Sequence, residues 1–392
     1  MVDTDIYLDH AATTPVDPRV LDVMLPFFSE RFGNPSSIYT RGQDARAGLD
    51  WARETLAALL GCQPRELVMT SGATESNNLA IKGVAWWHRF NRPEHGNHIV
   101  VSAIEHHAVL HAAEALIPHG FEISIVQPDS DGIVRPENIE RALRPDTCLV
   151  SVMYANNEVG TIQPIREIAD LAHQRGIIVH TDAVQAAGSL PLNVNDLGVD
   201  LLSLSAHKFY GPKGVGLLYV RRRTPIEWQQ HGGGQEGGRR GGTENVPLLV
   251  GMAAALALAV DEQAERNARM SQLRDRLIDG LLERVPDARL NGHPEQRLPN
   301  NVNLSFPGVE GETLLLSLDM LGIAASSGSA CSTGSTEPSH VLTALGLTPE
   351  TARGSLRLTL GKDTTEEQID RTIQIVSETV ERVRQMAEAP AS

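Results

Sequence analysis

The stretch that decides the fold joins an apolar run to a lysine, and it reads Leu201-Leu202-Ser203-Leu204-Ser205-Ala206-His207-Lys208-Phe209-Tyr210-Gly211-Pro212-Lys213-Gly214. The run 201–205 predicts a buried strand, and Lys208 would follow its carboxyl end, which is the edge where open α/β sheets bind ligands. Only four of the 34 basic residues are lysines. Unlike a guanidinium, an amine can lose its proton and bond covalently to a carbonyl group, so Lys208 is a candidate catalytic residue. A surface lysine beside a Gly-Pro turn is the alternative.

Length and composition bound the classes of function. The 392 residues suggest two domains of roughly 150 residues or more each, and the net charge of −15 argues against a nucleic-acid partner. The longest apolar stretch, 246–260, is shorter than the about 20 residues of a membrane span and predicts a buried helix between domains. No signal-peptide pattern opens the sequence, and Cys62, Cys148 and Cys331 form neither a disulfide framework nor a metal cluster. We therefore expect a cytoplasmic protein with no membrane partner and no resident metal.

Short apolar runs alternate with helical patterns through the first two thirds of the chain. The predicted strands are Leu67–Thr70, Ile99–Ser102, Leu149–Met153, Ile177–His180, Leu201–Ser205 and Val215–Val220. Helical spacing appears between them, for example over 139–143 and 165–175. Apolar strands separated by helices are typical of a mostly parallel sheet that is covered on both faces. The sequence therefore predicts a large α/β domain over residues 15–260.

A smaller α+β domain is expected from residues 1–14 together with 261–392. Its predicted elements are a charged helix (261–284), two strands with alternating patterns (300–306 and 355–360), and a last helix that opens with the capping-box pattern Thr364-Thr365-Glu366-Glu367. Between the two strands lies a loop of small polar residues, about 326–338, that contains Cys331. Its first ten residues include no aromatic or large aliphatic side chain, which predicts low local stability.

The predicted strand 67–70 leads into Ser71-Gly72-Ala73-Thr74 and then into a helical pattern. A glycine turn at a helix N-terminus presents unpaired N–H groups and the positive end of the helix dipole, which suits a phosphate. Serine and threonine also cap helices that bind no ligand, so both interpretations stay open for this segment.

Two further strand ends carry candidate groups. His106 follows the strand 99–102, where it could stack on an aromatic ligand or shuttle protons, or simply start a helix. His107 and His111 have the spacing of a metal-binding pair on a helix, but no third ligand is evident. Asp182 follows the strand 177–180, where a carboxylate needs a partner: either a protonated ring nitrogen or the N–H groups of the next helix.

Taken together, these strand ends describe a site for pyridoxal 5′-phosphate. Residues Gly72, Ala73, Thr74 and Ser205 suit the phosphate. Asp182 suits the pyridinium nitrogen, and Lys208 suits the aldehyde. The joint pattern is far more specific than any of its parts.

The chain resembles the cysteine desulfurases of the NifS/IscS type, within the class V aminotransferase family of fold-type I pyridoxal-phosphate enzymes. The resemblance covers nearly the whole chain. The matching motifs are Tyr7 to Pro15, Phe32 to Ser37, Thr70 to Ser76, Glu105-His106, Asn156-Asn157-Glu158, His207-Lys208 with its Gly-Pro-Lys-Gly tail, Ser326 to Cys331, and Glu337 to His340. The segment Arg240-Gly241-Gly242-Thr243 departs slightly from the usual Arg-Ser-Gly-Thr, without affecting any role.

The resemblance implies roles for individual residues. Lys208 would hold the cofactor aldehyde, His106 would stack on the ring, and Asp182 would pair with the ring nitrogen. The other cofactor-binding residues that it implies are Gln185, at the ring oxygen, Asn157, beside the ring, and Ala73, Thr74, Ser205 and His207, at the phosphate. Arg357, helped by Asn34, would bind the substrate carboxylate. The glycine-rich stretch 231–243 would reach a neighbouring subunit, where Thr243 adds a phosphate contact, so a homodimer is implied.

The implied reaction is removal of sulfur from L-cysteine, which gives L-alanine and a persulfide on Cys331. Lys208 would move the α-proton, and His106 would help to deprotonate a thiol. The partners would be an iron–sulfur scaffold or another sulfur acceptor, and Cys331 is a candidate for transient ligation of an iron–sulfur cluster. A selenocysteine lyase or a class V aminotransferase is the alternative, although an aminotransferase needs no nucleophilic thiol. Cys62 and Cys148, with apolar neighbours, are expected to be structural.

Overall fold

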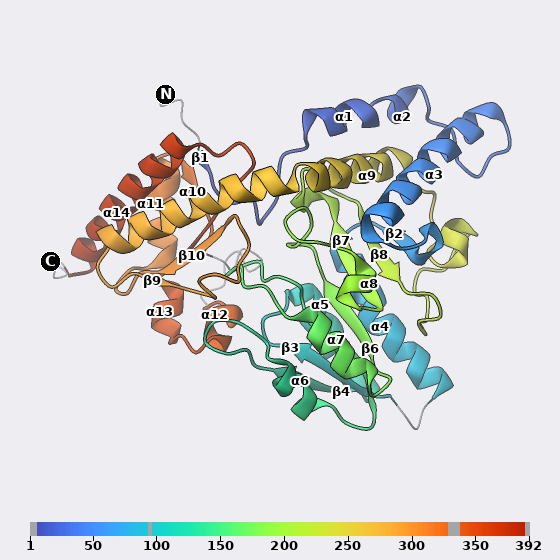
Figure 1. Cartoon of the computed structure of the whole chain (residues 1–392), viewed down its shortest axis with the longest axis horizontal. Helices are drawn as coiled ribbons and strands as arrows, with labels where there is room; N and C mark the ends of the chain where they lie inside the picture. The colour runs from blue at the N-terminus through green and yellow to red at the C-terminus, as the bar shows by residue number, and fades with distance from the viewer. Residues whose placement is uncertain (1–5, 93–95, 328–337, 389–392) are drawn as a thin grey trace.

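The structure is a computed structural model that describes residues 6–92, 96–327 and 338–388. Its centre is a seven-stranded sheet (Figure 1). The strands lie in the order β2 (Leu67–Thr70), β8 (Gly216–Val220), β7 (Leu201–Ser205), β6 (Ile178–Asp182), β5 (Thr147–Ser151), β3 (His98–Ser102), β4 (Glu122–Val126). Strand β8 is antiparallel to both of its neighbours, and the other pairs are parallel. The predicted mostly parallel α/β sheet is therefore confirmed.

Several strands of this sheet differ from the prediction: β3, β6 and β8 by one or two residues at one or both ends, and β4 and β5 more substantially. Strand β4 was not predicted because it lies at the edge of the sheet, where most of its side chains keep contact with solvent and the apolar run is interrupted. Strand β5 ends at Ser151, two residues before the predicted Met153, because the apolar residues Val152 and Met153 are buried outside the ladder. Apolar character reports burial and only indirectly reports strand pairing.

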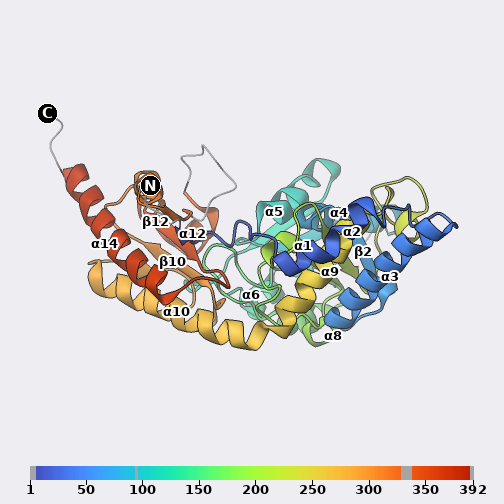
Figure 2. The same cartoon turned by 90° about the horizontal axis from the view of Figure 1, so that it is seen from above.

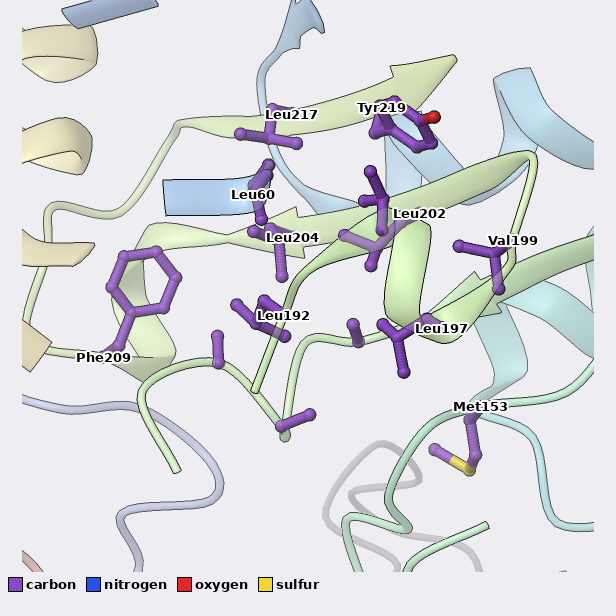
Figure 3. Packing of buried hydrophobic residues seen from close by; sticks show 14 of the residues in the cluster. Leu60, Met153, Leu192, Leu197, Val199, Leu202, Leu204, Phe209, Leu217 and Tyr219 are labelled. Carbon is purple, nitrogen blue, oxygen red and sulfur yellow. The ribbon is translucent and has the colours of Figure 1, made fainter. Parts of the chain in front are cut away.

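Helices cover both faces of this sheet, as its apolar strands require. One face packs on α4 (Ala73–Asn91) and α5 (His107–Glu114), and the other on α3 (Thr40–Leu60), α7 (Ile165–His173) and α9 (Val246–Asp261). The shorter helices of this part are α1 (Pro18–Met24), α2 (Pro26–Ser29), α6 (Pro136–Ala142) and α8 (Val194–Leu197). Figure 3 shows Leu204 of β7 near Leu217 of β8 and Leu60 of α3, and Leu202 of β7 near Tyr219 of β8. Leu201 belongs to the core on the opposite face, as strand alternation dictates.

A second, smaller part has its own core (Figures 1 and 2). It contains the antiparallel sheet β12 (Ser355–Thr359), β10 (Asn301–Ser305), β9 (Arg289–Leu290) and the parallel pair β1 (Ile6–Tyr7), β11 (Ile323–Ala324). Its helices are α10 (Gln263–Arg284), α11 (Gly311–Met320), α12 (His340–Ala344), α13 (Pro349–Arg353) and α14 (Glu366–Glu388). The division into 15–260 and 1–14 with 261–392 stays a proposal. The separate cores support it except at α12 and α13, whose buried apolar residues belong to the core of the large part.

The two parts are joined by a pair of helices. The helix α9 ends at Asp261, and α10 begins at Gln263 after a bend of 70° (Figure 1). Among the described residues no single helix has the length and apolar composition to cross a membrane; α9 and α10 meet that criterion only together, across their bend. Near the start of α14, Thr365 and Gln368 exchange hydrogen bonds, so the capping box lies one residue later than the pattern 364–367 predicts.

Candidate active site

A pocket of about 620 Å³ lies beside the carboxyl ends of the parallel strands β6 and β7. This volume suits a small organic ligand. Most residues predicted for the site line it: Ala73, Thr74, His106, Asn157, Asp182, Gln185, Ser205, His207, Lys208 and Arg357. They come from distant segments of the chain that meet here because successive strands end at the same edge of the sheet.

Lys208 closes a short 3₁₀ turn, Ala206–Lys208, directly after β7. Its Nζ donates hydrogen bonds to the carbonyl oxygens of Ala11 and Ala12, each at 2.6 Å. These carbonyls hold the amine at the pocket wall, and the alternative of a surface lysine at a turn does not describe this position. The pocket also contains Lys213, which is exposed.

The end of the pocket proposed for phosphate is built at the N-terminus of α4. The helix follows Gly72 and starts at Ala73, so its first N–H groups are free of helical partners. A Cβ built on Gly72 would meet no atom closer than Ser205 Oγ, at 3.9 Å, so the wall here is bare backbone beside an open space. His207 lies at the same pocket, and its Nδ1 is 3.1 Å from Thr13 Oγ1.

Asp182 ends β6 with both carboxylate oxygens engaged. Asn77 Nδ2 donates to Oδ2 at 2.7 Å, and the Val184 N–H donates to Oδ1 at 3.0 Å. The alternative role of Asp182, accepting hydrogen bonds from the N–H groups that follow it, is therefore fulfilled in part by the Val184 N–H. Because both neighbours are donors, the carboxylate is held as an acceptor, ready for a further donor from the pocket.

Burial sets the protonation of the ionisable groups around this pocket. It lowers the pKa of His106, and it lowers that of His207 to about 4, with Lys208 and Lys213 adding to the effect. His106 Nδ1 accepts a hydrogen bond from the Ala108 N–H at 3.1 Å, so its neutral ring carries the proton on Nε2. Burial raises the pKa of Glu105 to about 8, which leaves its carboxyl mostly protonated at neutral pH.

Arg357 projects from β12, and only 2% of the residue is exposed. Its Nη2 donates to Asp9 Oδ1 at 2.7 Å and its Nη1 donates to the Asn157 carbonyl oxygen at 3.0 Å. Its Nε is buried and has no hydrogen-bond partner within the described residues. The backbone of Arg357 pairs with Ser326, which precedes the cysteine loop.

Three predicted residues lie apart from this pocket or outside the described residues. Asn34 is exposed and accepts a hydrogen bond from the Ser36 N–H, so the chain does not bring it to Arg357. Thr243 lines a separate hollow that shares only Ser71 and Gly214 with the pocket. Cys331 lies outside the described residues.

Two cysteines and the His107–His111 pair lie outside the lining of this pocket. Cys62 and Cys148 are free thiols whose pKa burial raises to about 12, so neither is a ready nucleophile. His107 and His111 stack with ring centroids 4.7 Å apart. Within the described ranges, no group of three or more His, Cys, Asp or Glu side chains is arranged to hold a metal ion.

Two residues that contact the site were given no role by the sequence. Asn77, on the second turn of α4, is fully buried and holds Asp182; Asp9 holds Arg357. Asn77 and its buried neighbour Ser76 are the polar residues on a helix face that packs mainly through apolar side chains, but burial is not readable before the fold is known. Asp9 pairs with a residue 348 positions away, a contact that local pattern cannot predict.

A family model for class V aminotransferases matches residues 6–372. The chain belongs to this family. Curated cysteine desulfurase IscS of Methanosarcina thermophila is 51% identical over 382 residues, which are 97% of this chain and 93% of that protein. A solved NifS-like protein matches with a TM-score of 0.90 at 41% identity, over 96% of this chain and 100% of its own. A solved structure described as SspA in complex with cysteine matches with a TM-score of 0.81 at 38% identity, over 92% of this chain and 100% of its own.

These matches confirm the predicted fold-type I architecture and the resemblance to cysteine desulfurases. Enzymes of this family depend on pyridoxal phosphate, and the pocket fits that group. The bare backbone at Gly72 leaves room for a phosphate, and Asn77 Oδ1 and Arg357 Nε are buried polar atoms without partners in the described part of the chain. Lys208 supplies the required amine at the wall of the same pocket. The roles of individual residues stay predictions.

Proposed function

We propose that this protein is a cysteine desulfurase that uses pyridoxal 5′-phosphate to remove sulfur from L-cysteine, leaving a persulfide on Cys331 and releasing L-alanine. The observation that carries the proposal is a single pocket lined by Lys208, Asp182, His106 and Arg357. The cysteine desulfurases among the relatives, and the SspA structure described as a complex with cysteine, support it.

Each lining residue has a chemical task in this proposal. When bound, the cofactor draws electrons from the substrate α-carbon and so weakens the bond to its α-proton. Lys208 would bind the cofactor aldehyde and later carry that proton on Nζ. Asp182, oriented by Asn77, would hold the proton of the cofactor ring nitrogen. Arg357 would bind the substrate carboxylate through N–H groups not used by Asp9 and Asn157.

The other residues would bind and orient the cofactor. His106, uncharged at neutral pH, would stack on the ring. To help to deprotonate a thiol, its Nδ1 would have to release the hydrogen bond from the Ala108 N–H. The phosphate would be held by Ala73, Thr74, Ser205 and His207, and the ring by Gln185 and Asn157. The low pKa of His207 means that it would contribute hydrogen bonds rather than charge. Asn34 would reach Arg357 only through a change of conformation or from a second chain, since it lies outside the pocket.

Cys331 would supply the nucleophile. Its thiolate would form a bond to the substrate sulfur while the carbon–sulfur bond breaks, and the bonding electrons would stay with the carbon skeleton, which takes up a proton and leaves as alanine. The loop composition suits a segment that meets a buried substrate and then an acceptor protein. We propose an iron–sulfur scaffold or another sulfur-acceptor protein as that partner, with Cys331 as a transient cluster ligand.

We further propose that the protein is a cytoplasmic homodimer. Large apolar side chains are exposed on α2 and in the segment between α2 and α3: Phe28 (57% exposed), Phe32 (57%), Ile38 (92%) and Tyr39 (60%). Such groupings mark protein interfaces. The glycine-rich stretch 231–243, which would reach the neighbouring subunit, is tied to α3 of its own chain by the ion pair of Arg53 with the buried Glu236.

The test is incubation with L-cysteine and a reductant while alanine and sulfide are measured together. Equal amounts of both products are expected. Lys208→Ala should lose turnover and the visible absorption of the lysine-bound cofactor, whereas Lys213→Ala should keep that absorption. Cys331→Ser should bind cofactor and substrate but release almost no sulfide. Sulfur release by Lys208→Ala, or a persulfide found on Cys62 or Cys148 while Cys331→Ser stays active, would reject the proposal.

A further inference from the structure

The segment between β1 and α1 touches both ends of the proposed substrate site. We call residues 9–14 the N-terminal strap. At its start, Asp9 binds the Arg357 guanidinium at 2.7 Å. Two and three residues later, the carbonyl oxygens of Ala11 and Ala12 bind Lys208 Nζ. One short segment thus contacts the residue proposed for the substrate carboxylate and Lys208, whose place at the cofactor aldehyde the substrate amine would take.

The guanidinium of Arg357 is fixed from two directions. Of its five N–H donors, one on Nη2 is used by Asp9 and one on Nη1 by the Asn157 carbonyl oxygen. The remaining donors include Nε, which is buried and unpartnered within the described residues. Because only 3% of the Arg357 side chain is exposed, few other groups can reach its guanidinium, and we expect the orientation of the guanidinium plane to depend on this carboxylate.

The strap is itself held along its length, so it acts as a fixed spacer. Ala11 N–H donates to Thr359 Oγ1 at 2.9 Å, and the Ala11 carbonyl accepts from Gln185 Nε2 at 3.0 Å. Two residues of extended chain span at most about 7 Å, so the contacts of Asp9 and Ala11 cannot move far apart. The distance between the carboxylate-binding group and the amine is therefore set by this segment.

We infer that Asp9 is a positioning residue that makes the site selective for α-amino acids. It would orient Arg357 so that a carboxylate one carbon away from the amine meets the guanidinium while the amine takes the place of Lys208 at the cofactor aldehyde. The inference rests on the proposed function, which assigns the carboxylate to Arg357. We attribute the orientation of the Arg357 guanidinium to the hydrogen bond and not to the charge of Asp9. A neutral acceptor at position 9, such as asparagine, would keep that orientation and remove a negative charge that repels the incoming carboxylate.

The test compares two ligands that differ only by a carboxylate, L-alanine and ethylamine. Their dissociation constants are measured on the holoenzyme from the change in cofactor absorption, and the ratio of the ethylamine constant to the alanine constant reports the contribution of the carboxylate. In Asp9→Ala this ratio should fall by about ten- to a hundredfold, the worth of a hydrogen bond to a charged group, while the ethylamine constant stays nearly unchanged. In Asp9→Asn the ratio should stay within about threefold of the wild-type value or rise.

Asp200→Ala is the matched control, because Asp200 is a similarly buried carboxylate that pairs with Arg221 and His173 away from the pocket. It should lower the melting temperature without changing the ratio. If Asp9→Ala does not fold, Asp9→Glu serves, since it keeps the charge but displaces the acceptor and should also lower the ratio. An unchanged ratio in both, or an equal fall in Asp9→Asn, would overturn the inference.

Arg357→Ala separates this inference from the proposed function. If the ratio collapses in Arg357→Ala but not in Asp9→Ala, only the role of Asp9 is wrong. If the ratio does not change in Arg357→Ala, the carboxylate binds elsewhere, and both the assignment of Arg357 and the role of Asp9 are rejected.

Discussion

At the scale of single residues, burial decides which groups in the site carry charge. The low pKa of His207 and His106 leaves both rings neutral at pH 7, so the other basic side chains that line the pocket are Lys208, Lys213 and Arg357. Of these, Arg357 already has the Asp9 carboxylate as its partner. A neutral His106 with its proton on Nε2 can stack on a ring and still donate a hydrogen bond, which a charged and strongly hydrated imidazolium would do less well.

Replacing Arg357 by lysine tests the geometry of carboxylate binding. A lysine keeps the positive charge but not the two-pronged N–H pattern, so KM for L-cysteine should rise at least about tenfold while the cofactor stays bound. Steady-state kinetics and the cofactor absorption measure the two effects separately. A KM equal to that of the wild type would show that a point charge suffices.

His180 gives a pH prediction for stability. Its ring lies fully buried in β6 between Ser151 Oγ, at 2.8 Å, and Ser203 Oγ, at 3.0 Å, and burial lowers its pKa to about 3. The unfolded chain, with an ordinary histidine pKa near 6.5, therefore binds more protons between pH 6.5 and pH 3. Stability supplied by the neutral ring is complete above pH 6.5 and falls as the pH drops through this window, by up to about 1.4 kcal/mol per pH unit.

His180→Gln should flatten that dependence, because glutamine can still bridge the two serines but binds no proton. The melting temperature measured between pH 7 and pH 5 should fall less steeply in this variant than in the wild type. The exposed His231→Gln is the control and should keep the wild-type slope. Equal slopes in all three proteins would mean that His180 is not the group responsible.

The sequence identified the residues at strand ends better than the residues that support them. Lys208 and Asp182 could be predicted because a charged side chain after an apolar run is visible in a window of ten residues. Asn77 and Asp9 could not, since their significance lies in contacts across more than a hundred positions. The pocket lining agrees with most of the predicted site, whereas Asn34 and Thr243 lie outside it, and Thr243 is proposed to serve a neighbouring chain.

At the scale of elements, the proposed phosphate site depends on how closely β8 approaches the turn before α4. Gly216, the first residue of β8, packs directly against Gly72. A Cβ added at Gly216 would lie 2.6 Å from the Leu204 carbonyl oxygen and 2.7 Å from the Gly72 Cα and carbonyl carbon. Backbone lies on both sides, so a side chain there has nowhere to go without moving the N-terminus of α4.

Gly216→Ala should therefore weaken cofactor binding more than it weakens the fold. We expect the dissociation constant for pyridoxal phosphate to rise at least about tenfold and the melting temperature of the apoprotein to fall by a few degrees. Gly234→Ala is the matched control, because a Cβ there meets no atom within 4 Å and the residue has a negative φ. Unchanged cofactor affinity in Gly216→Ala would show that the turn adapts.

Element prediction from the sequence was accurate where strands are buried on both faces, and weaker elsewhere. Strand β7 occupies the predicted residues 201–205, because its continuous apolar run is bounded by polar groups. The edge strand β4 and the bend between α9 and α10 were not predicted. Both depend on neighbours: β4 on pairing with β3, and the bend on the need to pack one helix on each of two cores.

At the scale of the whole molecule, the proposed dimer explains why Thr243 lies outside the pocket of its own chain. The glycine-rich stretch that carries it is tied to this chain through Arg240, which pairs with Glu75 at 2.8 Å, and through the ion pair of Glu236 with Arg53. These contacts give the stretch a defined shape before any partner arrives, so it could present Thr243 to a second chain without further ordering cost.

Mixing two inactive variants tests whether Thr243 serves the neighbouring site. One chain carries Lys208→Ala and the other Thr243→Ala. The Lys208→Ala homodimer should lack the absorption of the lysine-bound cofactor, and the Thr243→Ala homodimer should bind pyridoxal phosphate poorly. If Thr243 acts across the interface, a heterodimer contains one complete site, formed by Lys208 of one chain and Thr243 of the other. Subunit exchange should then restore about half of the wild-type cofactor absorption per heterodimer. The complete site should bind pyridoxal phosphate with a dissociation constant close to that of the wild type. In the matched mixture, one chain carries both substitutions and the other carries none. If Thr243 acts across the interface, the site that contains Lys208 in this heterodimer lacks Thr243 at the phosphate and should bind the cofactor poorly. Restoration in the second mixture but not in the first would show that Thr243 acts within its own chain.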